Sequence, residues 1–141
     1  MSRLGQATGP LRIRTPGRAL VEITRDVTDW VAGQAMTDGL LTLFCRHTSA
    51  SLAIQENAAP AVKRDLLDWL DRIAPEDHGY AHDDEGPDDM PAHIKALLTG
   101  VSLTIPLIGG ALALGTWQGL YVVEHRRAAH DRQIALHLLG A

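Results

Sequence analysis

The sequence is poor in cysteine, in aromatic residues and in long apolar runs. Its single cysteine, Cys45, excludes an intrachain disulfide. Three Trp, two Tyr and one Phe are too few to suggest platforms on which nucleic-acid bases stack. No apolar run approaches the roughly 18 residues that a transmembrane helix needs, and residues 1–10 lack the apolar core of a signal peptide. We therefore expect a cytoplasmic protein with no membrane partner and no nucleic-acid partner.

The length and composition predict a single globular domain. A chain of 141 residues lies near the commonest domain size, and about two thirds of its unfolded surface is buried on folding. Hydrophobic residues make up 45% and charged residues 21%, as in ordinary globular proteins. We expect one domain over residues 1–141, with residues 1–10 as a loosely ordered N-terminal segment.

The negative charge is concentrated in one segment. The net charge is −4, but residues 76–90 hold seven acidic side chains and no Lys or Arg. The 13 basic and 10 acidic residues elsewhere leave the rest of the chain at +3. The segment has no regular period and contains Gly and Pro, which predicts a loop; long loops in small domains are often functional. We expect this loop to form part of the wall of a site, where its carboxylates raise the local concentration of cations.

The order of predicted elements indicates an α+β fold. Period-two patterns predict strands, and apolar positions at helical spacing predict a main helix that begins near Asn57 and Pro60 and stops before Pro75. Most connections are as short as hairpins, so the sheet is expected to be mostly antiparallel. The other predicted elements are strands near 11–14 and at 18–24, 40–48, 101–105, 111–114, 116–124 and 133–139, and short helices at 26–31 and 92–98.

Three histidines lie at positions where rigid elements present functional side chains. His47 ends a predicted strand, His82 lies in the acidic loop, and His93 is in the first turn of a short helix. Three imidazoles and a water would make an open zinc-type site. Taken singly, each residue also has an ordinary explanation: His47 as a satisfied core histidine, His82 as a solvated loop residue, and His93 as part of an amphipathic helix.

Other polar residues could contact a substrate. The hydroxyls of Thr48 and Ser49 suit hydrogen bonds to a phosphate or, alternatively, ordinary turn chemistry. A Ser–His nucleophile pair is disfavoured because neighbours along a strand point to opposite faces. Glu56 could act as a general base or support a histidine, or it could favour the helix start electrostatically.

The C-terminal half contributes a second polar group. Gln118, in the run LGTWQG, could bond an amide or phosphate oxygen, or it could belong to a bulged strand. Glu124, Arg126 and Arg132 could bind an anionic ligand; the alternative is a charged hairpin tip.

Several runs together resemble the YjbQ family, also described as the secondary thiamine-phosphate synthase family, over about residues 18–140. The resemblance implies an α+β fold whose antiparallel sheet is curved as a half barrel or sandwich, with one main helix and short helices. It also implies a homotrimer. The runs are HTSASLAIQEN (47–57), EDHGYAHDDEGPDDMPAHIK (76–95), GVSLTIPLIGGALALGTWQG (100–119) and VVEHRR (122–127).

The resemblance also implies an activity and a site. The activity joins a pyrimidine diphosphate to a thiazole phosphate with loss of pyrophosphate, as a main or a side reaction. The cofactor would be a divalent metal, zinc or similar, with magnesium an option for a diphosphate substrate. The alternatives are a non-catalytic trimeric module that binds a metal or a small phosphorylated metabolite, and a structural trimer. The expected metal ligands are His47, His82 and His93, the catalytic residues Glu56, Gln118 and Glu124, and the substrate contacts Arg46, Thr48, Ser49, Asn57, Trp117, Arg126 and Arg132.

Overall fold

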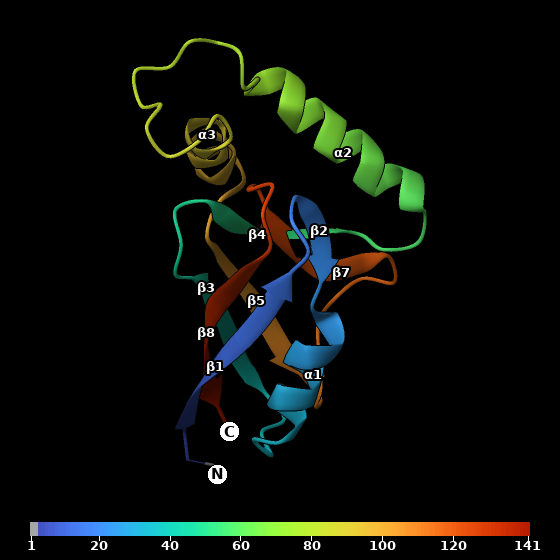
Figure 1. Ribbon diagram of the computed structural model, residues 1–141. Coiled ribbons are helices and arrows are strands. Elements are labelled where there is room, and N and C mark those ends of the chain that lie inside the picture. Colours follow the sequence, from blue (N-terminus) through green and yellow to red (C-terminus); the bar gives the residue numbers. More distant parts are fainter. Residues whose placement is uncertain (1–2) are drawn as a thin grey trace.

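A computed structural model describes residues 3–141 and gives the chain two antiparallel sheets and three helices over that range (Figure 1). The strand orders are β1-β8-β3-β5-β6 and β2-β7-β4. The sheets curl into a half barrel, so the predicted α+β class is confirmed. The elements are β1 (Gly5–Thr15), β2 (Ala19–Glu22), α1 (Thr24–Ala32), β3 (Gly39–Cys45), β4 (Ala50–Glu56), α2 (Pro60–Ile73), α3 (Asp89–Thr99), β5 (Ser102–Ile108), β6 (Ala111–Leu112), β7 (Gln118–Glu124) and β8 (His130–Gly140).

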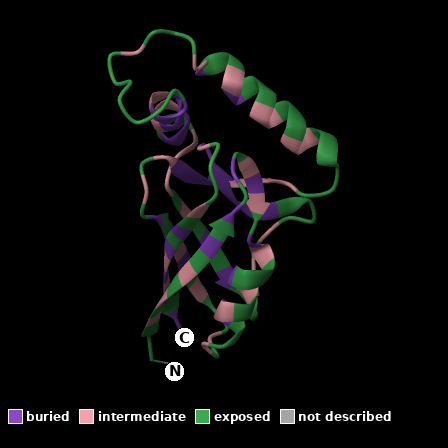
Figure 2. Ribbon diagram, in the orientation of Figure 1, coloured by how far each residue is buried: buried purple, intermediate pink, exposed green. Residues whose placement is uncertain are grey.

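The main core lies between the two sheets and follows the period-two pattern. On β3, Leu41, Leu43 and Cys45 are buried, and they pair in register with buried residues of β8. The alternation of buried and exposed positions along the strands is visible in Figure 2. Each fully buried leucine contributes about 1.5–3 kcal/mol relative to an exposed one. The predicted strand at 40–48 is therefore present, but it ends at Cys45, so His47 lies beyond it.

Helix α2 covers the outer face of the smaller sheet. The predicted helix is confirmed at Pro60–Ile73, although its N-cap residue is Ala59 and not Asn57. Of its predicted apolar positions only Leu70 is buried, whereas Trp69 is 49% exposed. Leu70 packs there in a second apolar cluster with Leu20 of β2 and Tyr121 of β7, and Figure 1 shows the helix lying beyond these two strands. An ion pair from Lys95 on α3 to Asp71, at 2.7 Å, helps to hold it.

Two strand predictions are corrected by the structure. Residues 5–10 are not loosely ordered: they belong to β1, which pairs with β8 from Gly5 to Thr15. Residues 1 and 2 lie outside the described part of the chain. No strand was predicted for residues 50–56, which form β4 and pair with β7. Both strands form because they pair with strands far along the chain, and a local sequence pattern does not reveal such partners. None of the helices over residues 3–141 is both long and apolar enough to span a membrane.

Candidate functional site

Two histidines and an aspartate converge at the start of α3. His82 lies in the loop before the helix, Asp89 is the first helical residue, and His93 follows four residues later on the same face. The Nε2 atoms of His82 and His93 lie 2.8 and 3.0 Å from the same oxygen, Oδ2 of Asp89. The three potential ligand atoms all lie within 4.8 Å of one another. This arrangement has the ligand types and the spacing of a metal site.

A backbone contact orients the ring of His93. Its Nδ1 lies 2.8 Å from the carbonyl oxygen of Thr48, and because a carbonyl only accepts, Nδ1 carries a proton. A neutral His93 therefore presents a lone pair at Nε2 to the carboxylate of Asp89. Two acceptors face each other unless the ring gains a second proton or a cation lies between them. Backbone carbonyls hold metal-binding histidines in the same way.

Asp89 is buried, with only 2% of the residue exposed. Burial raises its pKa, but the hydrogen bond with His82 and the charges of His93 and Arg126 outweigh that effect, so the net pKa is lowered. The pKa of His82 is raised, mainly by its hydrogen bond to Asp89. The cluster therefore carries negative charge directed at the two imidazoles.

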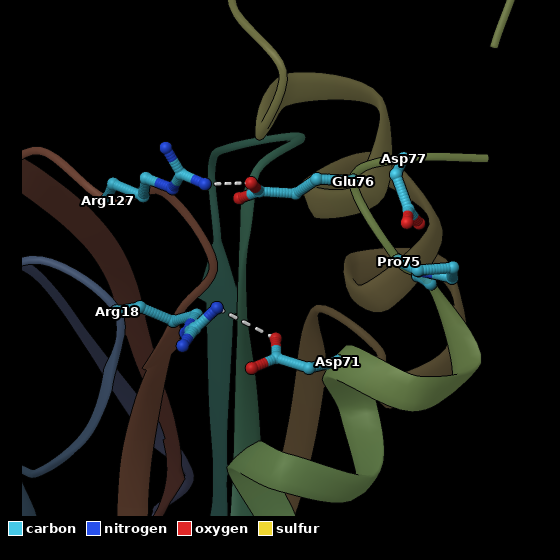
Figure 3. Close-up of a pocket in the computed structure, with 7 residues that line it drawn as sticks. Arg18, Asp71, Pro75, Glu76, Asp77 and Arg127 are labelled. Carbon is cyan, nitrogen blue, oxygen red and sulfur yellow. Dashed lines mark hydrogen bonds and ion pairs between the residues drawn. The ribbon is translucent and has the colours of Figure 1, made fainter. Parts of the chain in front are cut away.

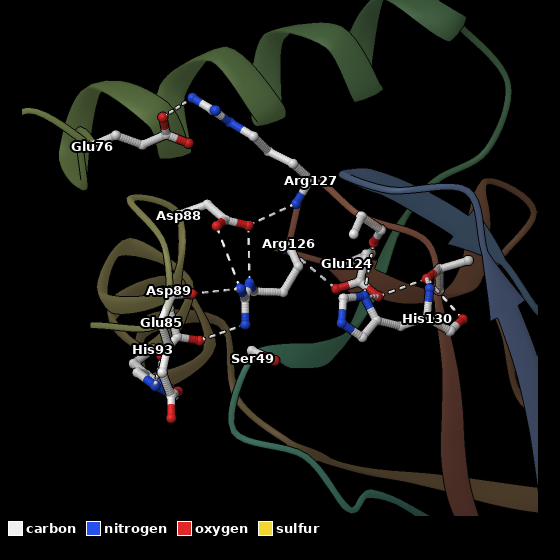
Figure 4. A network of polar contacts seen from close by, with 12 residues as sticks. Ser49, Glu76, Glu85, Asp88, Asp89, His93, Glu124, Arg126, Arg127 and His130 are labelled. Atoms are coloured by element: carbon white, nitrogen blue, oxygen red, sulfur yellow. Dashed lines mark hydrogen bonds and ion pairs between the residues drawn. The ribbon is translucent and has the colours of Figure 1, made fainter. Parts of the chain in front are cut away.

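Arg126 ties the acidic loop to the end of β7 (Figure 4). Its Nη1 donates to Oδ1 of Asp89 at 2.7 Å, its Nε donates to Asp88 at 2.9 Å, and its Nη2 donates to the carbonyl of Glu85 at 3.0 Å. The backbone N–H of Arg127 also donates to Asp88, and its side chain pairs with Glu76. The loop is therefore held in one conformation by basic residues of another element. That conformation places both His82 and Asp89 in the cluster.

His47, the third predicted ligand, is not among the three residues of this cluster. Its Nε2 accepts a hydrogen bond from the backbone N–H of Gln133 at 2.7 Å. Coordination through Nδ1 would then require an anionic imidazolate. Asp89 supplies the third potential ligand atom of the cluster. The signal that could have found it is the spacing of Asp89 and His93, which puts both on one face of a helix.

His47 and His93 nevertheless line one pocket. The pocket has a volume of about 390 Å³ and a largely apolar wall. Its lining residues are His47, Thr48, His93, Ala96, Leu97, Gly100 and Val101.

Glu124 and Arg132 form a buried ion pair. Glu124 is fully buried, Arg132 donates Nε to its Oε1 at 2.7 Å, and Thr15 donates to the same oxygen at 2.6 Å. Burial raises the pKa of Glu124, but these hydrogen bonds outweigh it and lower the net pKa. Arg132 also donates to the Ser49 hydroxyl at 3.0 Å. This arrangement favours a structural role for the pair over the predicted roles of Glu124 in catalysis and of Arg132 in substrate binding.

In a single chain, the remaining residues predicted for catalysis or substrate binding lie away from the cluster. Strands β4 and β7 pair from Ala50↔Glu124 to Glu56↔Gln118, which spans about 20 Å at roughly 3.3 Å per residue. Glu56 and Gln118 are therefore at the far end of the strands from Thr48. Asn57, which donates to Glu22, and Trp117, which is 63% exposed, follow them there. Arg46 is exposed and lines a separate hollow over β1 and β8.

A larger pocket, of about 590 Å³, lies beside the end of α2 (Figure 3). Arg18 pairs with Asp71 at 2.8 Å, and Arg127 pairs with Glu76. Asp77 adds a third carboxylate. Because both arginines are paired and acids are in excess, the pocket is poorly suited to a phosphate.

Known proteins place the chain in a family. The sequence profile described as "UPF0047 protein YjbQ-like" matches residues 10–141. UPF0047 protein sll1880 of Synechocystis is 46% identical over 92% of this chain and 89% of its own, and UPF0047 protein YjbQ of Salmonella typhimurium is 44% identical over 84% and 86%.

Solved structures agree with the profile. A conserved YjbQ/UPF0047 protein of Clostridium acetobutylicum superposes with a TM-score of 0.85 at 36% identity, over 92% of this chain and 98% of that one. A YbjQ-like protein of unknown function from Sulfolobus solfataricus shares the fold, with a TM-score of 0.92 at 23% identity, over 99% and 100% of the two chains. The profile and the two closely related sequences, matched over most of their lengths, carry the assignment: the chain belongs to the YjbQ/UPF0047 family.

Proposed function

We propose that this protein is a small metal-dependent enzyme that joins a pyrimidine diphosphate to a thiazole phosphate with loss of pyrophosphate. The observation that supports a metal is the convergence of His82, Asp89 and His93 on one point. The substrates follow from the family resemblance. Three protein ligands leave coordination positions open to a substrate, as in catalytic sites.

The donor set indicates the kind of ion. Two imidazoles and one carboxylate suit zinc or a similar transition metal, whereas magnesium prefers oxygen ligands and would depend on the diphosphate to supply them. When bound, a divalent ion would supply positive charge that stabilises the departing pyrophosphate. The chain's own contribution is to hold the ligands. Thr48 fixes the ring of His93, and Arg126 fixes the carboxylate of Asp89.

Arg126 and Arg132 are better assigned to positioning than to phosphate binding. Arg126 already donates to two carboxylates, and Arg132 is buried against Glu124. Asp84 and Glu85 lie 3.5 and 3.8 Å from His82, so the open side of the cluster is acidic and attracts cations.

We further propose that the protein works as a homotrimer. Apolar side chains are exposed on both outer helices: Trp69 by 49% and Ile73 by 42% on α2, and Leu97 by 84% and Leu98 by 55% on α3. Contact with other copies would cover them. Glu56 and Gln118, which lie about 20 Å along the sheet from Thr48, would then reach a cluster only on a neighbouring copy.

Metal content and product formation test the proposal. Protein purified without a histidine tag should hold one divalent ion per chain by elemental analysis. His82→Ala and His93→Ala should lose the ion and the formation of thiamine phosphate while keeping the circular dichroism of the wild type. A trimer should have three times the 15.3 kDa chain mass by light scattering.

Other outcomes would overturn the proposal. Sub-stoichiometric metal that is unchanged in both variants would exclude the site. Metal bound without turnover would favour the non-catalytic binding module. A loss of stability in His93→Ala without any change in metal content would favour a purely structural role for the histidines.

A further inference from the structure

His47 is held in a single tautomer by the backbone of β8. The N–H of Gln133 donates to its Nε2 at 2.7 Å, so the proton of the neutral ring is on Nδ1. Burial and the nearby charge of Arg132 lower the pKa of His47 and keep the ring neutral. Among residues 3–141, Nδ1 has no hydrogen-bond partner, which leaves one N–H group for a ligand.

The same ring lines the pocket that contains His93. A member of the metal cluster, His93, is therefore part of the pocket wall, which also includes Ala96, Leu97 and Val101. At about 390 Å³, the volume lies within the usual range for small-molecule sites. A ligand that reached a metal ion in the cluster and also filled the pocket would need a negatively charged end, an apolar planar body and a hydrogen-bond acceptor facing His47.

We infer that His47 is a specificity residue and not a metal ligand: it donates its Nδ1–H to a ring nitrogen of the pyrimidine half of the substrate, whose ring lies in this pocket. The inference rests on the proposed function, because it takes the diphosphate to be the group that reaches the cluster. The pyrimidine, which carries the diphosphate, then occupies the adjoining pocket, and the thiazole approaches from outside it.

A matched pair of variants tests the role of the Nδ1–H group. In His47→Gln the amide oxygen stands near the former Nε2 and still accepts from Gln133, but the Nδ1 donor is lost. In His47→Asn the amide nitrogen stands near the former Nδ1 and keeps a donor. The probes are inorganic pyrophosphate and the pyrimidine diphosphate, titrated calorimetrically into zinc-saturated protein.

The wild type should bind the pyrimidine diphosphate more tightly than pyrophosphate. His47→Gln should lose about tenfold in affinity for the pyrimidine compound, as expected for one hydrogen bond, with unchanged affinity for pyrophosphate and unchanged zinc content. His47→Asn should recover part of the loss.

The failures are distinguishable. Equal affinity of the wild type for both probes, or an unaffected His47→Gln, would overturn the inference while the proposed function stood. Loss of zinc in His47→Gln would show that His47 is a ligand after all. A wild type that binds neither zinc nor pyrophosphate would overturn the proposed function, and the inference with it.

Discussion

Arg126 donates from Nη1 to Oδ1 of Asp89 at 2.7 Å, and the other oxygen of that carboxylate faces both His82 and His93. One arginine thereby fixes the direction in which the candidate metal ligand points. Partners of this kind change metal affinity by about 10–100-fold when they are removed. Arg126→Met should therefore weaken zinc binding by that factor in a competition titration with a chelator.

Arg127→Met is the matched control for that variant. The Arg127 side chain pairs with Glu76 at the surface and does not touch the cluster, while its backbone contact with Asp88 survives the substitution. Zinc affinity should stay within twofold of the wild type. An equal loss in both variants would mean that general loosening of the loop, and not the orientation of Asp89, controls the affinity.

Asp89→Asn should abolish stoichiometric zinc binding, because the substitution removes the carboxylate that contacts both imidazoles. In the metal-free variant the pKa of His82, raised mainly by its hydrogen bond to Asp89, should fall toward its ordinary value. Elemental analysis and an NMR titration of the imidazole would measure the two effects. Asp84→Asn, a change in an exposed carboxylate of the same loop, should retain zinc; retention by Asp89→Asn as well would contradict the assigned ligand.

Breaking the Glu124–Arg132 pair should cost stability. Glu124 is fully buried, so Arg132→Leu leaves an uncompensated charge and should lower the free energy of unfolding by about 3–5 kcal/mol. Adding Glu124→Leu should recover much of the lost free energy of unfolding, as measured by urea denaturation. If Glu124 or Arg132 acted directly in catalysis, the double variant would regain its stability and still be inactive. The pKa of Glu124 is lowered in the folded state, so its contribution is present above its ordinary pKa and is lost as the pH falls through the folded value.

His125 should make the protein sensitive to mild acid. Burial and the charge of Lys95 lower its pKa to about 3, with a smaller contribution from Arg132 and an opposing one from Glu124. Between about pH 6.5 and pH 3 the unfolded chain binds a proton that the folded chain does not. As the pH is lowered through this range, the free energy of unfolding should therefore decrease by up to about 1.4 kcal/mol per pH unit.

His125→Gln tests this dependence, since it does not titrate and retains a polar group near the hydroxyl of Ser51, which lies 2.8 Å from the imidazole. Urea denaturation at pH 7, 6, 5 and 4 should give a shallower slope than the wild type. An identical slope would assign the acid sensitivity to other groups.

Mixed assemblies should test whether the site is shared between copies. Glu56→Gln changes a residue at the end of β4 that lies far from the cluster, and Asp89→Asn changes the cluster itself at the start of α3, so neither variant alone should form thiamine phosphate. If Glu56 of one copy serves the cluster of another, co-expressed chains should regain part of the activity in assemblies that contain both. Absence of complementation in confirmed mixed trimers would assign each site to a single chain.

Patterns within single segments were sufficient for much of the fold. The period of two put Leu41, Leu43 and Cys45 on one face, which is buried. The main helix, at Pro60–Ile73, was predicted to within a few residues at its start and to stop before Pro75. These features depend on local periodicity and on proline, so a short stretch of sequence determines them. The runs shared with relatives determined the family.

Only the tertiary structure decided which side chains meet. Residues 5–10 became a strand through β8, more than a hundred residues away, and the Nε2 of His47 was taken up by the backbone N–H of Gln133. Asp89 entered the cluster because Arg126, 37 residues along the chain, holds the acidic loop against β7. The sequence by itself identified the acidic loop and its histidines as unusual. The spacing of Asp89 and His93 on one helix face is a local pattern, but whether His82 joins them depends on the long-range ion pairs and hydrogen bonds that hold the acidic loop, and these leave no local pattern.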